Sequence, residues 1–385
     1  MFWDPKQLSY HNSNNSEGSY SEGRYVLWPV SVFNQAIADA ARIYPKEISP
    51  MLAPAFRAYD HYYSREYHAY CASYDFNGNR DIYYDDNAQV ASSFLSAYEV
   101  TGDRIYLDKG VENVHFLMGG QQQDGGVRWH IAKEGCNTCT TAECGIAAMR
   151  LARFVQNNQV YIQFAKKCCD WIFNKVQADD KLICDGLESD GHGGLKRNDT
   201  KWTYNQGTPL TLCCLLYAFT KEEIYFERAH ELALAVTDHN TAIFDRDTLN
   251  MDARHYRDHT YFYQLLAEGL ADYLLFFESK SPPETVNQIK GELMHTIKYV
   301  YEYLRDPTDQ LYYQSFEIFR ISRDHWERFK QLTGEGKEYQ PSGAERETAD
   351  DSVPMDNRKL VKCLMGTASA ARIFFQTARV HPVVG

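Results

Sequence analysis

The chain has 385 residues, of which 44% are hydrophobic and 24% charged, and its formal net charge is −12. This composition is typical of a folded protein, and the excess of negative charge disfavours binding to nucleic acid or to an anionic membrane. No apolar run reaches the roughly 18 residues that a membrane-spanning helix needs, so we expect no membrane span and no anchor.

The first 24 residues are polar and rich in Ser and Asn, and we expect them to form a lead-in to a single domain over residues 25–385. They lack the charged segment and following apolar segment of a secretory signal peptide. We therefore expect a cytoplasmic monomer, with secretion after removal of a signal as the alternative.

Apolar residues recur at helical spacing along most of the chain, and the helices that they indicate are joined alternately by short turns and long loops. Strand patterns are negligible apart from short runs such as 311–321. Helices are predicted at 25–44, 48–63, 86–100, 258–279, 284–304 and 357–378, and in pairs between 103 and 236. Long loops are predicted at 64–84, 120–136, 178–203, 239–257 and 305–356.

An internal repeat runs through the middle of the chain. TGDRIYLDKGVENVHFLM, NNQVYIQFAKKCCDWIF and KEEIYFERAHELALAV align without gaps around three tyrosines that are 55 and 64 residues apart. Helix pairs repeated at such intervals are typical of helical arrays and closed toroids. We predict an all-α toroid of about six helix hairpins. The aligned residues are Tyr106, Tyr161 and Tyr225, followed four positions later by Gly110, Ala165 and Ala229.

Two adjacent carboxylates, Asp85 and Asp86, stand where a polar loop ends and a strongly periodic helix begins. An acidic residue in this position is the ordinary signature of a helix N-cap. A pair of carboxylates is also the minimal machinery for glycoside hydrolysis, and mutual repulsion would raise the pKa of one of them. The spacing alone leaves both interpretations open.

The other long loops contain aromatic, acidic and amide side chains, notably GGVRWH at 125–130, Asp185-Gly186 and WTYNQGT at 202–208. Flat rings with polar partners suit a site for polyhydroxylated sugar rings. A tyrosine-rich core is the alternative reading of the 28 tyrosines.

Neither a metal nor a cofactor is expected. The ten cysteines include adjacent pairs inside apolar helical patterns, which indicates reduced, buried thiols. Cys136-x-x-Cys139 has no second pair to complete a zinc site, and the acidic run from Asp75 to Asp81 has Arg80 where a calcium loop needs glycine.

The segments YYDDNAQVASSFLSAYEVTGDRIYLDKG, GGVRWH and TYNQGTPL resemble those of glycoside hydrolase family 76, the α-1,6-mannanases, and the likeness is to a fungal-type member. The resemblance covers most of residues 25–380 and implies an (α/α)6 barrel and a retaining mechanism. By position, Asp85 would be the nucleophile and Asp86 the acid/base. The substrate-binding residues that it implies are Tyr84, Asn87, Arg128, Trp129, Asp185, Tyr204, Asn205 and Gln206.

The chain departs from the family pattern at Gln89, where an aromatic residue is frequent, and at Tyr263-Gln264, where a Lys-Gly pair is common. The resemblance implies hydrolysis of α-1,6-linked mannosides, with endo action, on mannan or a mannose-containing oligosaccharide. Transglycosylation of cell-wall or anchor mannosides and a non-catalytic mannan-binding role are the alternatives.

Overall fold

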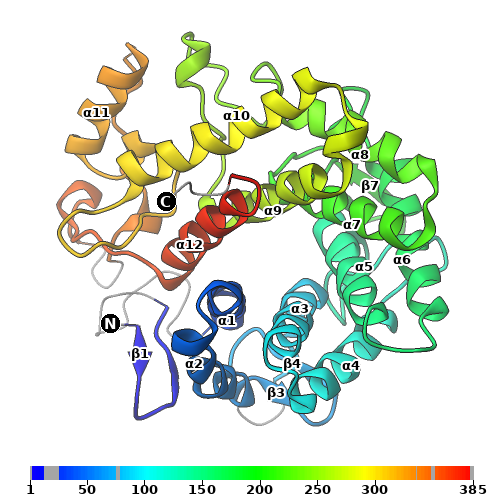
Figure 1. The fold of residues 1–385 in the computed structure, drawn as a ribbon. Coiled ribbons are helices and arrows are strands. Elements are labelled where there is room, and N and C mark those ends of the chain that lie inside the picture. The colour runs from blue at the N-terminus through cyan, green and yellow to red at the C-terminus, as the bar shows by residue number, and fades with distance from the viewer. Residues whose placement is uncertain (1, 13–25, 75–78, 335, 348–351, 382–385) are drawn as a thin grey trace.

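The computed structural model describes residues 2–12, 26–74, 79–334, 336–347 and 352–381, and its helices form a closed ring (Figure 1). Each of six inner helices packs against the next, and the last packs against the first. The predicted all-α, (α/α)6 barrel is therefore confirmed. The inner helices are α1 (Leu27–Ile43), α3 (Tyr84–Thr101), α5 (Thr138–Ala152), α7 (Tyr204–Thr220), α9 (Thr260–Phe277) and α12 (Leu364–Ala378).

An outer layer surrounds this ring, because each of the first five inner helices is followed by a short turn and a helix that packs back on it. The inner helices consequently run in one direction, and the long loops that precede them gather on one face. The outer helices are α2 (Pro45–Arg57), α4 (Arg104–Met118), α6 (Gln159–Trp171), α8 (Glu223–Val236) and α10 (Pro283–Tyr299), whereas α11 (Arg323–Thr333) lies in the long connection before α12 (Figure 1). Single turns of 3₁₀ or π type cover Ala58–His61, Ile172–Val176, Met251–Ala253, Glu278–Lys280, Val300–Leu304, Ile318–Arg320, Gly343–Glu345 and Met355–Asn357.

The internal repeat marks equivalent positions on α4, α6 and α8. Its three tyrosines are buried, and so are the small residues one turn later. A Cβ atom on Gly110 would lie 2.8 Å from Cδ2 of Leu95 on α3, so the small residue allows the outer helix to approach the inner one. The repeated residues therefore mark where each of these outer helices packs against its inner helix.

Some predicted elements differ from the structure. The loop predicted at 305–356 contains the helix α11. The last helix begins at Leu364, not at 357, because Leu360 pairs with Arg346 in extended backbone and Cys363 caps the helix, its Sγ accepting from the Gly366 N–H at 3.1 Å. The strand expected at 311–321 is wrong. That segment makes isolated bridges at Tyr312 and Ser315 before a 3₁₀ turn.

Short strands occur in segments that show no alternation of apolar and polar residues. Two hairpins pair β1 (Trp3–Asp4) with β2 (Ser9–Tyr10) and β3 (Tyr63–Ser64) with β4 (Ala69–Tyr70). A third sheet orders β5 (Cys136–Asn137), β6 (Gly186–Ser189) and β7 (Leu195–Asn198), and it ties the loop before α5 to the loop before α7.

The described part of the predicted lead-in packs on the barrel. The Tyr10 ring is buried, with its centroid 4.8 Å from that of Phe33 on α1. Residues 13–25 lie outside the described residues, and the domain boundary stays a prediction.

All ten cysteines are free and buried, as expected. Within the described residues, no three His, Cys, Asp or Glu side chains are grouped so that they could hold a metal ion. Part of the calcium-like run, residues 75–78, lies outside that range. No described helix combines the length and the apolarity that crossing a bilayer would take.

Buried ion pairs join the inner helices around the barrel axis. The guanidinium of Arg372 on α12 donates to Oδ2 of Asp39 on α1 at 3.2 Å and to Oε2 of Glu268 on α9 at 2.7 Å. Arg150 on α5 pairs with the other oxygen of Glu268. The ring is therefore closed at α12 by charge as well as by apolar packing.

Replacing Arg372 by methionine is expected to lower the free energy of unfolding by about 3 kcal/mol, because the buried Asp39 and Glu268 would each keep one cation, Arg42 and Arg150 respectively, in place of two. Arg104→Met is the matched control, since that arginine is 73% exposed and its loss should change stability by less than about 0.5 kcal/mol. Denaturant unfolding measures both, and equal small losses would contradict a structural role for the axial network.

Candidate active site

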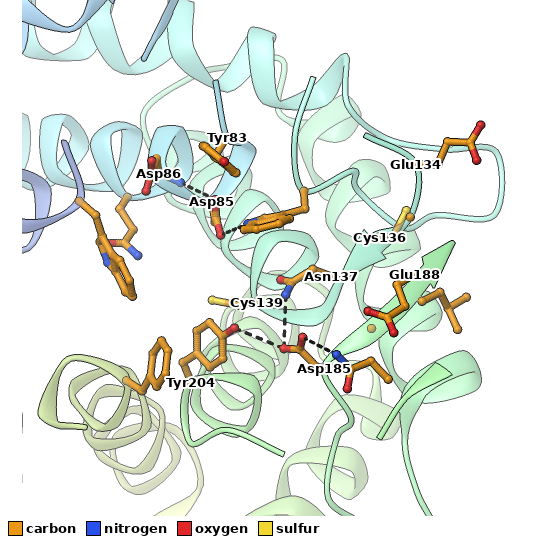
Figure 2. A pocket seen from close by; sticks show the side chains of 18 of the residues that line it. Tyr83, Asp85, Asp86, Glu134, Cys136, Asn137, Cys139, Asp185, Glu188 and Tyr204 are labelled. Carbon is orange, nitrogen blue, oxygen red and sulfur yellow. Dashed lines mark hydrogen bonds between the residues drawn. The ribbon is translucent and has the colours of Figure 1, made fainter. Parts of the chain in front are cut away.

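A cleft of about 500 Å³ opens on the face where the inner helices begin (Figure 2). Its size is that of an ordinary ligand site. Asp85 and Asp86 come from the start of α3, and Tyr204 from the start of α7. The cleft is lined by Val26, Trp28, Tyr83, Asp85, Asp86, Gln89, Trp129, Glu134, Gly135, Cys136, Asn137, Cys139, Asp185, Gly186, Leu187, Glu188, Asn198, Tyr204 and Phe262.

The two aspartates occupy the first turn of α3 and differ in their hydrogen bonds. Oδ1 of Asp85 accepts from the backbone N–H of Asp86 at 2.9 Å, and Oδ2 accepts from Nε1 of Trp129 at 2.9 Å. Asp85 thus satisfies one free N–H of the helix start and still faces the cleft. The N-cap residue of α3 is Tyr83, and its side chain makes no capping hydrogen bond, so the interpretation of the two aspartates as N-cap residues is wrong. Their role in a site stays a prediction.

Their electrostatic surroundings also differ. Burial raises the pKa of Asp85 to about 6, against the effect of its two hydrogen bonds, and the charge of Asp185 adds to the rise. Burial raises the pKa of Asp86 well above its usual range, and the charges of Asp85 and Asp81 raise it further. The pair therefore titrates in two steps, with the first proton lost from Asp85 and the second held by Asp86.

Asp185 is the centre of a second polar group across the cleft from Asp85 (Figure 2). Its carboxylate accepts from Nδ2 of Asn205 at 2.8 Å and from the Tyr204 hydroxyl at 3.3 Å. Amide groups of Asn137, at 3.4 Å, and Asn198, at 3.3 Å, also donate to it. These donors come from β5, β7 and α7, so the short sheet and the helix start fix its orientation together.

Comparison with known proteins identifies the family. A model of glycosyl hydrolase family 76 matches residues 2–335. The chain belongs to this family. It is 30% identical over 378 residues to the meiotically up-regulated gene 191 protein of Schizosaccharomyces pombe, covering 92% of this chain and 84% of that protein. It is 29% identical over 205 residues to the mannan endo-1,6-alpha-mannosidase DCW1 of Saccharomyces cerevisiae, covering 49% of this chain and 43% of that one.

A solved structure with the same fold is that of an inactive variant of the α-1,6-mannanase GH76A of Salegentibacter sp. HEL1_6, with two aspartates replaced by asparagine, in complex with α-1,6-mannotriose. The TM-score is 0.69 at 14% sequence identity, over 98% of this chain and 95% of that one. At 14% sequence identity, this similarity shows that the two proteins share a fold.

Five of the ten predicted site residues line the cleft of this family 76 protein: Asp85, Asp86, Trp129, Asp185 and Tyr204. The other five lie behind it. Tyr84 is buried, with its ring stacked on Phe116 at 4.8 Å, and Asn87 is buried with its amide bonded to both backbone groups of Tyr70. These two therefore support the helix start and do not reach a ligand.

The remaining three residues, Gln206, Asn205 and Arg128, contact neighbouring elements and do not line the cleft. The buried Gln206 amide accepts from the Ile183 N–H and donates to the Ile183 carbonyl, both at 2.8 Å. Asn205 is buried and acts through its bond to Asp185. Arg128 lines a separate hollow on the far side of the loop 120–136. Their direct contact with substrate, expected from the sequence, is not supported by these positions.

Sequence reasoning missed Trp28 and Phe262, which line the cleft from the starts of α1 and α9. Trp28 is the second residue of α1, as Asp85 is of α3, and Phe262 is the third residue of α9, as Asp86 is of α3. These two residues could have been predicted, because parallel inner helices bring their first turns to one face and both residues lie in a first turn. It also missed Asn137 and Asn198, whose positions depend on strand pairing between loops distant in sequence.

The hydrogen bond from Trp129 stabilises the charged form of Asp85, so its removal should raise the pKa of Asp85. We expect Trp129→Phe to raise it from about 6 by about one unit, the size of one hydrogen bond to a charged group. Carboxyl carbon NMR titration measures this without any substrate. Trp326→Phe, on the distant α11, is the control, and an unchanged Asp85 titration in Trp129→Phe would show that the indole does not tune it.

Proposed function

We propose that this protein is a retaining glycosidase that cleaves α-1,6-linked mannosides within a chain, with Asp85 as nucleophile and Asp86 as acid/base. The observation that carries the proposal is the difference in pKa between two adjacent aspartates in the cleft, because glycoside hydrolysis by a carboxyl pair needs one ionised and one protonated group. Their position in one helical turn favours the short separation of a retaining pair. Membership of family 76 and the names of the α-1,6-mannosidase relatives support the substrate class.

In the first step the Asp85 carboxylate attacks the anomeric carbon, and a mannosyl ester forms as the bond to the leaving oxygen breaks. The Asp86 carboxyl group donates its proton to that oxygen. In the second step ionised Asp86 takes a proton from water, the resulting hydroxide oxygen bonds to the anomeric carbon, and the ester to Asp85 breaks. Two displacements restore the original configuration.

The cleft extends well beyond the catalytic pair. Glu134 and Glu188 lie on the side of the cleft opposite Asp85 and Tyr204 (Figure 2), so the cleft has room for sugar units beyond the one at Asp85. The Asp185 group supplies fixed polar atoms for the hydroxyls of these sugar units. The names of the relatives, mannan endo-1,6-alpha-mannosidases, support endo action.

Linear α-1,6-mannan, with α-1,2-mannan and β-1,4-mannan as controls, tests the proposal directly. We expect internal cleavage of the α-1,6 polymer alone, seen as a series of oligosaccharides early in the reaction. Asp85→Asn and Asp86→Asn should each lower kcat by about 10²–10⁴-fold or more, since each removes one half of the chemistry. Hydrolysis that survives both substitutions would contradict the site, and products extended onto an added mannose acceptor would identify transglycosylation instead of hydrolysis.

The pH profile of kcat/KM should have its acid limb near pH 6. As the pH falls through about 6, Asp85 binds a proton and can no longer attack, so the rate falls. As the pH rises through the higher pKa of Asp86, the acid is lost and the rate falls again. An acid limb near pH 4, the ordinary pKa of a carboxyl group, would contradict the assignment of Asp85.

A further inference from the structure

A wall of aromatic rings borders the cleft on the side of Tyr204. The Phe262 ring on α9 stacks on Tyr204 of α7, with centroids 4.3 Å apart and an angle of 24°. The Trp28 ring on α1 lies 5.8 Å from Phe262, tilted by 32°. Three inner helices thus contribute one continuous apolar surface from their first turns.

The fold holds these rings firmly in place. A Cβ atom on Gly207 would lie 2.2 Å from the Leu265 carbonyl oxygen, so α7 and α9 approach as closely as backbones can just beyond Tyr204 and Phe262. Oδ2 of the buried Asp258 accepts from both the N–H and the hydroxyl of Thr203, each at 2.7 Å. The residues just before Tyr204 and Phe262 are therefore tied together.

The wall and the catalytic pair line the same cleft, and Trp28 neighbours the helix that carries the pair. Gln89 follows Asp85 by four residues of helix, or roughly 6 Å along the axis of α3. The Ser31 hydroxyl donates to the backbone carbonyl oxygen of Trp28 at 2.8 Å and lies 3.4 Å from the side-chain Oε1 of Gln89. This short chain of contacts places Trp28 beside the second turn of α3.

The two rings have no part in the chemistry at Asp85 and Asp86, yet both are half-exposed in the cleft. A flat apolar surface matches the C–H face of a pyranose, and binding to it removes apolar area from water. The opposite side of the cleft carries Glu134, Glu188 and Asn198, which suit hydroxyl groups. The cleft therefore has one face built for stacking and one for hydrogen bonding.

We propose that Trp28 and Phe262 form a sugar-binding subsite, one mannose unit away from the cleaved bond, that sets the preferred length of the substrate. This inference rests on the proposed function, because it takes the ligand to be a mannose oligosaccharide. Binding at such a remote subsite holds the oligosaccharide in position relative to Asp85 and Asp86. It should therefore raise kcat/KM for substrates long enough to reach the subsite and leave kcat/KM for shorter ones unchanged.

The test separates binding from catalysis by using the inactive Asp85→Asn/Asp86→Asn protein as background. Calorimetric titration with α-1,6-mannobiose and α-1,6-mannotetraose should give at least tenfold tighter binding of the tetraose. Adding Phe262→Leu or Trp28→Ala should remove most of this difference and leave the affinity for mannobiose within about twofold. Trp28→Phe, which keeps a flat ring, should retain most of it.

Tyr301→Ala removes an exposed ring from the turn Val300–Leu304, which does not line the cleft, and should leave the length dependence unchanged. Equal affinities for the two oligosaccharides, or a length dependence that survives both Phe262→Leu and Trp28→Ala, would overturn the subsite. Hydrolysis of α-1,6-mannan by the wild-type protein, run in parallel, decides the proposed function separately.

Discussion

Two carboxyl groups on consecutive residues cannot both be ionised where water is largely excluded, and the cleft of this protein depends on that constraint. Asp85 and Asp86 are held together by the first turn of α3, which fixes their backbone. Two hydrogen bonds favour the charge on Asp85, whereas the charges of Asp85 and Asp81 oppose the ionisation of Asp86. The difference between the two residues is thus local, and it is enough to give them different protonation states.

The barrel supplies the conditions for that difference. The six parallel inner helices begin on one face, and five of them contribute residues of their first turns to the cleft. The loops before these helices bury the pair while leaving room for a ligand. The short sheet of β5, β6 and β7 holds Asp185 opposite Asp85, so a second negative charge faces the pair across the cleft. Trp129 counteracts this charge through its N–H. A change in any of these elements is expected to appear first in the titration of Asp85.

Much of the fold could be predicted from the sequence, because helix hairpins are local. The periodic apolar pattern and the aligned tyrosines depend on contacts between neighbouring helices. The position of Asp85 and Asp86 was predictable for the same reason, since a loop ends and a helix begins there. The start of α12 was not, because the pairing of Leu360 with Arg346 competes with the helical pattern before Cys363.

The lining of the cleft was only half predictable. A motif gives neighbouring residues equal weight, but a helix turns them in different directions, and Tyr84 and Asn87 consequently face the interior while Asp85 and Asp86 face the cleft. Gln206 is bonded to Ile183, 23 residues earlier, and Asn137 is joined to Gly186 by strand pairing. Such contacts join residues that are far apart in the sequence, and they produce no periodic pattern of apolar residues that could predict them. Trp28 and Phe262 become visible as cleft residues only when the ring of helix starts is assembled.

The most direct test of the account is azide rescue of the two alanine variants with an activated α-mannoside. Asp86→Ala should regain turnover with azide and yield a mannosyl azide of retained α configuration, because Asp85 still forms the ester that azide then attacks. Asp85→Ala should give the inverted β product or none. A retained product from Asp85→Ala would contradict the central claim, since it would make Asp86 the nucleophile.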